Sequence, residues 1–508
     1  MKTTHVSIVC ASAALVVAGF AAYIDAQASS PPSSRVGMWK QVGYFKASRP
    51  GEGDELGHST ALSADGTTLA VGAKNERSAA TGINGNQADN SAFSAGAVFV
   101  YARNGNRWAQ QGYVKASNSG ADDQFGFAIA LSADGNTLAV SAPFEDSAAA
   151  GVNGNQADNS VENSGAVYIF TRTGTSWSQQ AYIKASNTGE KDEGDQFGYS
   201  ISLSGDGNTL AVGVIGEDSS ATGINGDQSD NKANGSGAAY VFTRTGGAWS
   251  QQAYVKSSMT RPNVLFGYSI GLSGNGDTLA VAEYDADRGK GALHVLTRTG
   301  GTWSHQARLQ ASNAENGDSL GYSLAISEDG NTIAAGAADE DCMTPGVNPP
   351  GCDKDQPQDN SSGAAYVFVR SGTTWTQQAF IKASNPGKED WFGVHIALSG
   401  DGNTLAVCAP NEDSAAKGIN GKQDDDSADG AGAVYVFIRT GTTWAQHAYL
   451  KGANTEQFDE IGSSAAFTRD GRMIAVGAHF ESSGAQGFNG NQADNSVPRS
   501  GAVYVFTR

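Results

Sequence analysis

The chain is 508 residues long, and its 52 Asp and Glu residues outnumber its 33 Lys and Arg residues, which gives a formal net charge of −19. A surface this acidic does not neutralise phosphate groups, so nucleic acids and anionic membranes are excluded as partners. Charged residues make up only 17% of the chain, and aromatic residues alternate with β-branched ones in many short runs. This composition favours a folded all-β protein over a disordered one.

The N-terminal residues have the layout of a secretory signal peptide. Lys2 precedes an apolar run over residues 6–24, and the triplet Ala26-Gln27-Ala28 follows it. This arrangement predicts cleavage after Ala28. Because the apolar run approaches the length of a membrane span, an uncleaved N-terminal anchor is the alternative. We expect a signal peptide at 1–28, a linker at 29–37 and a mature chain without a transmembrane span, exported to the periplasm, the cell surface or the medium.

Seven copies of one repeat follow. A tryptophan marks each copy, and a second marker, Phe-Gly or an apolar variant of it, also occurs seven times. The tryptophans are Trp39, Trp108, Trp177, Trp249, Trp303, Trp375 and Trp444. Repeats of this length indicate a solenoid or a propeller.

Each repeat contains four runs with the character of β-strands. In the second repeat these runs are Phe125–Ser132, Asn136–Ala142, Gly165–Arg172 and Trp177–Lys184. Each is short, rich in Val, Ile, Tyr or Phe, and bounded by turn-forming residues. The Asp134-Gly135 pair between the first two runs favours a tight hairpin turn. Four antiparallel strands per repeat are typical of one propeller blade.

The two ends of the repeat array complement each other. The last copy stops at its third strand, residues 501–508, while the segment 38–48 resembles a fourth strand with no copy in front of it. We therefore predict a seven-bladed β-propeller over 38–508, built of four-stranded antiparallel blades and closed by the N-terminal strand. Closure also hides the sheet edges that an open array would expose.

These repeats resemble the FG-GAP repeats of integrin α-subunit propellers. The resemblance rests on Phe125-Gly126, the Asp134-Gly135 turn, the run 139–143 and the run 165–170. It implies a seven-bladed propeller that is often extracellular and often binds ligands or mediates adhesion. Many repeats of the family also bind calcium between their first two strands. Here that turn carries Asp134 as its single carboxylate, too few oxygen ligands for calcium, so this family site is not expected.

The loops after the second and fourth strands of each blade emerge on one face of the ring, which we call the long-loop face. A second motif recurs there, GVNGNQADNS at residues 151–160 in the second repeat. Asn-Gly and Asp-Asn pairs build compact turns through bonds between side chain and backbone. The alternative is a calcium site, with oxygen ligands from Glu145, Asp146, Asn155 and Asp158.

The fourth repeat departs most from the others. Only 54 residues separate Trp249 from Trp303, against 69 or 72 for the other copies. Its long loop is cut to 285–291, and these changes predict a notch in which Arg261, Arg288 and Lys290 form a ligand site. The alternative is a neutral deletion, since surface loops tolerate changes of length.

Cys342 and Cys352 bracket a loop rich in proline and glycine. In an exported protein such a pair predicts a disulfide. A zinc site is the alternative, but no histidine lies near either cysteine. Cys408 lies in an apolar run and is expected to be a buried free thiol.

No constellation of residues in the sequence predicts catalysis. The histidines have no metal-binding spacing, and no serine lies in a G-x-S-x-G motif. We expect a monomeric, non-catalytic propeller that binds a protein or a glycan through its long-loop face. A carbohydrate-active enzyme and a structural surface component are the two alternatives.

Overall fold

The computed structural model describes residues 38–189, 194–352 and 360–508. The predicted signal peptide at 1–28 and the linker at 29–37 lie outside these ranges. Residues 39–508 form one compact unit. Within the described ranges, no helix is long and apolar enough to span a membrane.

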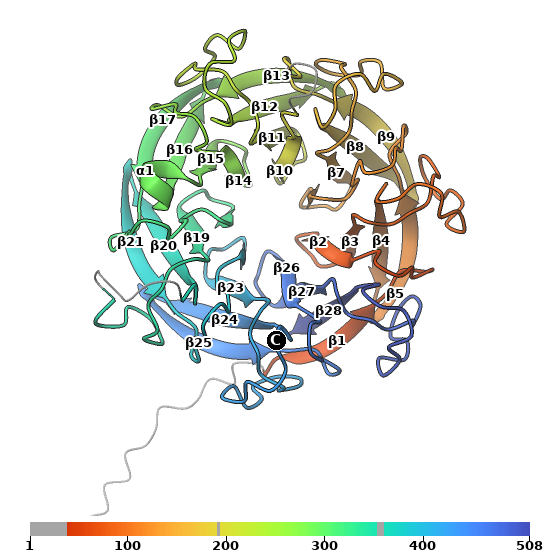
Figure 1. Cartoon of the computed structure of the whole chain (residues 1–508), viewed down its shortest axis with the longest axis vertical. Coiled ribbons are helices and arrows are strands. Elements are labelled where there is room, and N and C mark those ends of the chain that lie inside the picture. Colours follow the sequence, from red (N-terminus) through yellow and green to blue (C-terminus); the bar gives the residue numbers. More distant parts are fainter. Residues whose placement is uncertain (1–37, 190–193, 353–359) are drawn as a thin grey trace, which may run out of the picture. The chain divides into compact units, whose positions relative to one another are not determined.

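The unit consists of seven four-stranded antiparallel sheets arranged around a ring (Figure 1). The innermost strands are β2 (Leu56–Leu62), β6 (Ile129–Leu131), β10 (Phe197–Leu203), β14 (Phe266–Leu272), β18 (Leu324–Ile326), β22 (His395–Leu398) and β26 (Ile461–Phe467). The second strands are β3 (Thr68–Ala73), β7 (Thr137–Ala142), β11 (Thr209–Val214), β15 (Thr278–Glu283), β19 (Thr332–Ala337), β23 (Thr404–Ala409) and β27 (Met473–Ala478).

The third strands are β4 (Ala97–Asn104), β8 (Ala166–Thr173), β12 (Ala238–Thr245), β16 (Ala292–Thr299), β20 (Ala364–Ser371), β24 (Ala433–Thr440) and β28 (Ala502–Thr507). The outer strands are β5 (Arg107–Val114), β9 (Ser176–Ile183), β13 (Ala248–Val255), β17 (Thr302–Leu309), β21 (Thr374–Ile381), β25 (Thr443–Leu450) and β1 (Lys40–Phe45). One short helix, α1 (Ala286–Gly289), lies in the fourth blade. The predicted seven-bladed propeller is confirmed.

The N-terminal strand closes the ring. β1 pairs antiparallel with β28, and the register runs from Lys40 opposite Thr507 to Phe45 opposite Val503. The last blade therefore takes three strands from the end of the chain and one from its beginning, as predicted. An isolated parallel bridge between Leu56 and Gly501 links this blade to the first one.

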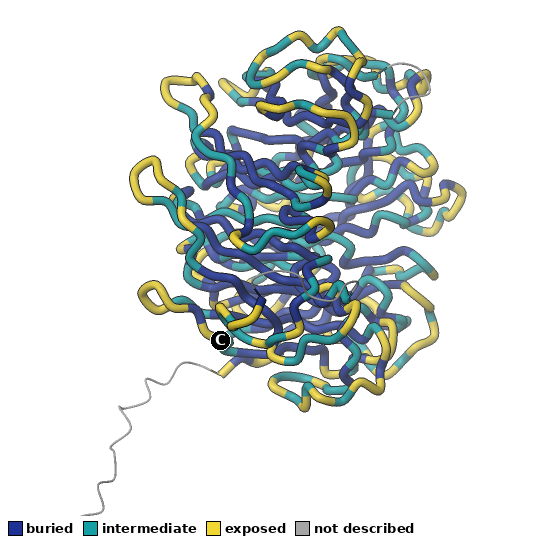
Figure 2. The backbone as a smooth tube through the Cα atoms, turned by 60° about the vertical axis from the view of Figure 1, so that its left-hand side comes forward, coloured by how far each residue is buried: buried dark blue, intermediate teal, exposed yellow. Residues whose placement is uncertain are grey.

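The hydrophobic core lies between the blades, and Figure 2 shows it as a buried interior under exposed loops. All six residues of β7 are buried, because this strand has neighbouring strands on both edges and neighbouring blades on both faces. The predicted turn before β7 forms with a positive φ of 65° at Gly135. The Asp134 carboxylate there accepts the backbone N–H of Asn136 at 2.9 Å.

The predicted first strand of the second blade was too long. We expected it to start at Phe125, but β6 starts at Ile129. The reason is a turn at the Phe-Gly marker, where the N–H of Phe127 donates to the carbonyl of Gln124 and Gly126 has a φ of 94°. This conformation interrupts the regular pairing; in β10, which has the same turn, the register shifts between Phe197 and Ser200.

The tryptophan marker connects neighbouring blades at the outer strands. The indole Nε1 of Trp177 donates to Gln111 Oε1 of the preceding blade at 3.1 Å, and the Arg172 guanidinium covers the same indole ring. Trp249, Trp303, Trp375 and Trp444 donate to the preceding blade in the same way. The strict repetition of tryptophan therefore has a structural cause.

Candidate functional site

The repeated Asn-Gly motif fastens the long loop to the outer strand of its own blade. The N–H of Asn153 donates to the Tyr182 carbonyl at 2.7 Å, and the N–H of Tyr182 donates to Asn153 Oδ1 at 3.0 Å. Asn153 has a φ of 57°, a conformation that asparagine tolerates better than most residues. Positive φ and the matching bond pair recur at Asn84, Asn225, Asn348, Asn420 and Asn489.

Glu145, a predicted calcium ligand, lies in a buried ion pair. Its Oε2 is 2.8 Å from Lys184 Nζ, and both side chains are at most 1% exposed. Its Oε1 accepts hydrogen bonds from the Tyr182 hydroxyl at 2.9 Å and from Asn118 Nδ2 at 2.8 Å. The carboxylate is thus bound by two side chains of its own blade, Lys184 and Tyr182, and by Asn118, which follows the outer strand of the preceding blade.

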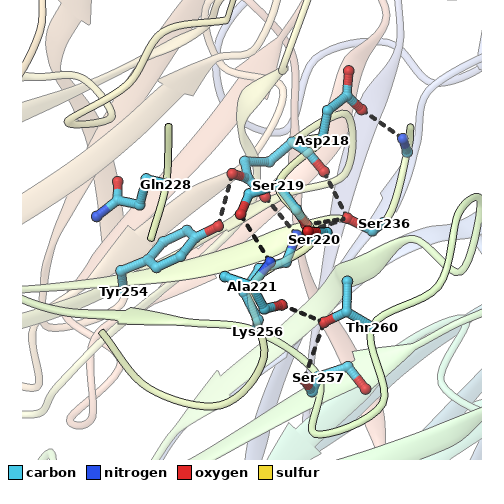
Figure 3. A network of polar contacts seen from close by, with 12 residues as sticks. Asp218, Ser219, Ser220, Ala221, Gln228, Ser236, Tyr254, Lys256, Ser257 and Thr260 are labelled. Atoms are coloured by element: carbon cyan, nitrogen blue, oxygen red, sulfur yellow. Dashed lines mark hydrogen bonds and ion pairs between the residues drawn. The ribbon is translucent and has the colours of Figure 1, made fainter. Parts of the chain in front are cut away.

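The same ion pair recurs in six of the seven blades. The other copies are Lys46–Glu481, Lys115–Glu76, Lys256–Glu217, Lys382–Glu340 and Lys451–Glu412. Figure 3 shows the copy in the third blade, where Lys256 reaches the hydroxyl of Ser236, and that hydroxyl donates to two carbonyls of the long loop. Because a buried charge without a partner is costly, these pairs hold the start of each long loop in place.

The remaining predicted calcium ligands accept backbone hydrogen bonds within the long loop. Asp146 Oδ1 accepts the N–H of Asn163 at 2.9 Å, Asn155 Oδ1 accepts that of Ala157, and Asp158 Oδ1 accepts that of Ser160. Within the described ranges, no three His, Cys, Asp or Glu side chains are grouped so that they could hold a metal. Calcium binding by Glu145, Asp146, Asn155 and Asp158 stays a prediction.

The fourth blade replaces the Lys–Glu pair with a different cluster. Glu283 Oε2 lies 3.0 Å from His294 Nε2, and both side chains are buried. The Arg308 guanidinium bonds Asp287 Oδ2 at 2.8 Å, and Gln310, at the position of the recurring lysine, donates to the same oxygen. The shortened loop leaves no partner glutamate at its usual place, which explains why lysine is absent there as well.

The three basic residues predicted in this blade lie around that cluster. Arg261 is 52% exposed, and its Nη1 lies 3.5 Å from Asp287 Oδ1. Arg288 lies in α1 with a φ of 72°, and Lys290 Nζ donates to the carbonyl of Ala314 at 3.3 Å. Arg261 is therefore paired with a carboxylate, because Asp287 lies beside it in the shortened loop.

Cys342 and Cys352 form a disulfide with their Cα atoms 5.6 Å apart. It closes the predicted loop in the fifth blade, next to the ion-paired Glu340, whose Oε2 accepts the N–H of Cys342. Cys408 is buried with a free thiol, and burial raises its pKa.

A channel of about 460 Å³ runs between the inner strands at the centre of the ring. The residue that follows each marker glycine lines it in six blades: His58, Phe127, Tyr199, Tyr268, Tyr322 and Val394. One layer further in, serine hydroxyls donate to carbonyls of the next blade, for example Ser200 to Gly267 at 2.8 Å. Isoleucine and leucine side chains such as Ile201 and Leu324 line the channel below them.

Aromatic rings form an arc around this channel through the second to fifth blades. Phe127 contacts Tyr199, Tyr199 contacts Tyr268, and the ring centroids are 5.4 and 5.3 Å apart. Tyr322 continues the arc at 5.5 Å from Tyr268, and Tyr284 stacks on Tyr268 at 4.4 Å. Tyr284 follows β15 directly, so the arc lies at the end of the channel that opens on the long-loop face.

Histidines line the other side of the channel. The ring of His58 contacts both Phe127 and His479, at 5.3 and 5.8 Å, and His395 lines the channel from the sixth blade. Burial lowers the pKa of His395 to about 4 and that of His479 to about 3, while burial and the charge of Lys74 lower the pKa of His58. All three imidazoles are therefore neutral at physiological pH.

Four ionisable side chains lie near these histidines, at the end of the channel that opens on the long-loop face. Glu55 pairs with Arg499 at 2.7 Å and with Lys74 at 3.7 Å. Glu460 Oε2 lies 3.5 Å from His479 Nε2. Burial raises the pKa of Glu460 to about 7, although the charge of Arg499 opposes this shift.

The sequence did not indicate this channel site. The histidines have no metal-binding spacing in the sequence, but His58, His395 and His479 lie close together in the fold. The one available signal was the residue after each marker glycine, which varies from blade to blade while its neighbours repeat. We therefore regard the channel mouth, consisting of the aromatic arc and these histidines, as the candidate functional site.

Comparisons with known proteins bear on the fold. No curated protein matches the chain. Among solved structures, hydrazine synthase from Kuenenia stuttgartiensis is similar with 13% sequence identity and a TM-score of 0.47, and the alignment covers 85% of this chain and 93% of that one.

The repeats themselves match a family model, described as the FG-GAP repeat. The matching residues are 108–170, 177–242, 303–368 and 375–437, together just over half of the chain. Each stretch starts at the tryptophan of one outer strand and runs through the first three strands of the next blade. The chain is a member of the FG-GAP repeat family.

Proposed function

We propose that this protein is an extracellular, non-catalytic binding module that recognises a protein or a glycan at the channel mouth on its long-loop face. The observation that carries the proposal is the aromatic arc of Phe127, Tyr199, Tyr268 and Tyr322. Small-ligand sites are concave, mostly apolar and equipped with a few polar groups, and this description fits the channel mouth. The arc also breaks the sevenfold repetition, as expected for a site shaped to one ligand.

Export supports an extracellular role. The N-terminal sequence has the layout of a signal peptide, and the Cys342–Cys352 disulfide suits an oxidising compartment. Membership of the FG-GAP family is consistent with this location. The module is proposed to act as a monomer, since the ring needs no second chain to close.

One observation favours binding over catalysis. Glycosidases use a pair of carboxyl groups on either side of the substrate. The glutamates that recur on the long-loop face are instead buried against lysine, as Glu145 is against Lys184. Calcium binding at the long loops is a separate proposal. It is tested by comparing the melting temperature of the protein in calcium and in a chelator.

A carbohydrate-active enzyme is the second candidate, and one observation favours it. Glu460, with its pKa raised to about 7, could act as a general acid near neutral pH. Glu55 is close enough to contribute to that shift. An enzyme of this kind would lose its turnover in the Glu460→Gln variant.

The test is an array of glycans and of peptides probed with the secreted chain. Specific binding without release of products would support the binding module. Release of sugars from a bound polysaccharide, lost in Glu460→Gln, would replace it with the enzyme. Absence of binding to either array would contradict the proposal and favour a structural surface component.

A further inference from the structure

The lining of the central channel carries no formal charge. Among its described lining residues there is no Asp, Glu, Lys or Arg, and its polar side chains are Ser, Thr, Tyr and His. Burying a charged group without a counter-charge costs several kcal/mol, which is a large part of the binding free energy of a typical ligand. Such a lining therefore selects against ions. A neutral ligand fits this environment best.

The charges at the mouth do not alter that selection. The two glutamates at this place would attract a cation if they were free. However, Glu55 already has Arg499 and Lys74 as partners. Burial raises the pKa of Glu460 to about 7, so this carboxyl group is only about half ionised near neutral pH, and its Oε2 lies 3.5 Å from His479 Nε2. The negative charge near the mouth is therefore largely compensated or neutralised, which leaves only a weak attraction for a lysine or arginine side chain.

The aromatic arc offers surface of a particular kind. Ring faces are electronegative and attract the slightly positive hydrogens of C–H groups. Phe127, Tyr199, Tyr268 and Tyr322 form a continuous curved wall of this type. A pyranose ring has one or two faces that consist of C–H groups, with its hydroxyls around the edge.

The opposite wall supplies partners for hydroxyl groups. A neutral imidazole has one nitrogen that donates and one that accepts. His58 lines the channel, and its buried Nδ1 has no hydrogen-bond partner among the described residues. His395 adds a second neutral imidazole. A hydroxyl can donate and accept, so it satisfies either tautomer.

We propose that the channel mouth binds a neutral sugar ring, with its C–H face against the aromatic arc and its hydroxyls toward His58 and His395. This inference rests on the proposed binding function and specifies the ligand class. The channel volume of about 460 Å³ lies within the roughly 300–1,000 Å³ of small-ligand pockets. The occupant is a terminal or single residue of a neutral glycan rather than a peptide side chain.

The chain itself provides conservative variants for a test. Blade six carries Val394 where blade four has Tyr268, and blade two carries Phe127 where blade one has His58. Tyr268→Val and His58→Phe are therefore substitutions that the fold already accepts at equivalent positions. Phe93→Ala is the matched control, because Phe93 is an aromatic residue of a long loop that is 58% exposed and outside the channel lining.

The experiment compares these three variants with the unmodified chain on an array of neutral glycans, uronic-acid glycans and lysine- or arginine-rich peptides, followed by titration calorimetry of each hit. We expect a neutral glycan to bind, with affinity reduced at least tenfold in Tyr268→Val and His58→Phe and unchanged in Phe93→Ala. Melting curves of the variants would show that the fold is retained.

The other outcomes separate the two proposals. A neutral glycan that binds equally well to both channel variants would overturn the channel mouth as the site in both proposals, and would leave only a binding module whose site lies elsewhere on the protein. A basic peptide that binds and is lost in Tyr268→Val would overturn the sugar but keep the channel as the site. Absence of any hit would contradict both proposals.

Discussion

In the outer part of each blade the same side chains recur around the ring, whereas the inner strands present different side chains to the channel. Six blades contain the buried Lys–Glu pair, as in Lys184–Glu145. At the channel, by contrast, one equivalent position is occupied by His58, Phe127, Tyr268 and Val394 in different blades. This difference indicates that the repeated residues stabilise the ring, while the residues that vary between blades are available to recognise a ligand.

The largest expected effect is loss of the closing strand. Removal of residues 29–48 deletes β1 and exposes the edge of β28, which pairs with it over the whole strand. We expect no cooperative melting and a shift to aggregates in size-exclusion chromatography, because unpaired edges associate. Removal of residues 29–37 alone leaves β1 intact and is the control. A monomer with an unchanged melting temperature after the longer deletion would contradict closure by β1.

The next largest effect concerns the repeated ion pair. Lys184→Met leaves Glu145 buried without a counter-charge, and we expect the free energy of unfolding to fall by about 3–5 kcal/mol. Lys232→Met is the matched control, since Lys232 is 77% exposed in its pair with Asp230 and should change stability by about 1 kcal/mol or less. Urea denaturation measures both. Equal losses in the two variants would show that the buried pair has no special role.

A smaller effect is expected from a recurring aspartate in the connectors between blades. Burial raises the pKa of Asp123 to about 7, with the charges of Glu145 and Asp146 adding to the shift while the Gly120 N–H and Lys115 oppose it. Because the folded pKa lies above the unfolded value, this group contributes stability that is present below about pH 4 and is lost as the pH rises through 7.

Asp123→Asn removes that dependence. Compared with the unmodified chain, the variant should gain on the order of 2 kcal/mol in unfolding free energy between pH 5 and pH 8. The comparison of two chains cancels the channel histidines, whose lowered pKa values act in the opposite direction. Parallel denaturation curves at every pH would mean that Asp123 is ionised in the fold.

The smallest effect is expected in the blade that departs from the repeat. Arg261 and Arg288 are exposed and Lys290 is half-buried, so replacing all three with alanine should change stability by about 1 kcal/mol or less. If the channel is the site, ligand affinity should also be unchanged. A large loss of affinity would instead place recognition in the fourth blade, at the predicted notch.

The sequence predicted most of the fold, because each blade needs the same turn, tryptophan and strand pattern. Asp134-Gly135 and Trp177 are examples in which local chemistry alone indicated the structure. The channel was not predictable in this way, since His58, His395 and His479 are far apart in the chain and meet only after the ring closes. Likewise, Glu145 looked like a metal ligand because its partner Lys184 lies 39 residues away.

The central claim separates residues that hold the ring from residues that recognise a ligand. The most direct measurement takes Lys184→Met and Tyr268→Val together and determines, for each, the free energy of unfolding and the affinity for the glycan found on the array. We predict that Lys184→Met loses about 3–5 kcal/mol of unfolding free energy but keeps its affinity for the glycan while folded. Tyr268→Val should lose at least tenfold in affinity, or about 1.4 kcal/mol, and should lose less stability than Lys184→Met. If Tyr268→Val instead lost stability and bound the glycan normally, the aromatic arc would be part of the framework and the account would be wrong.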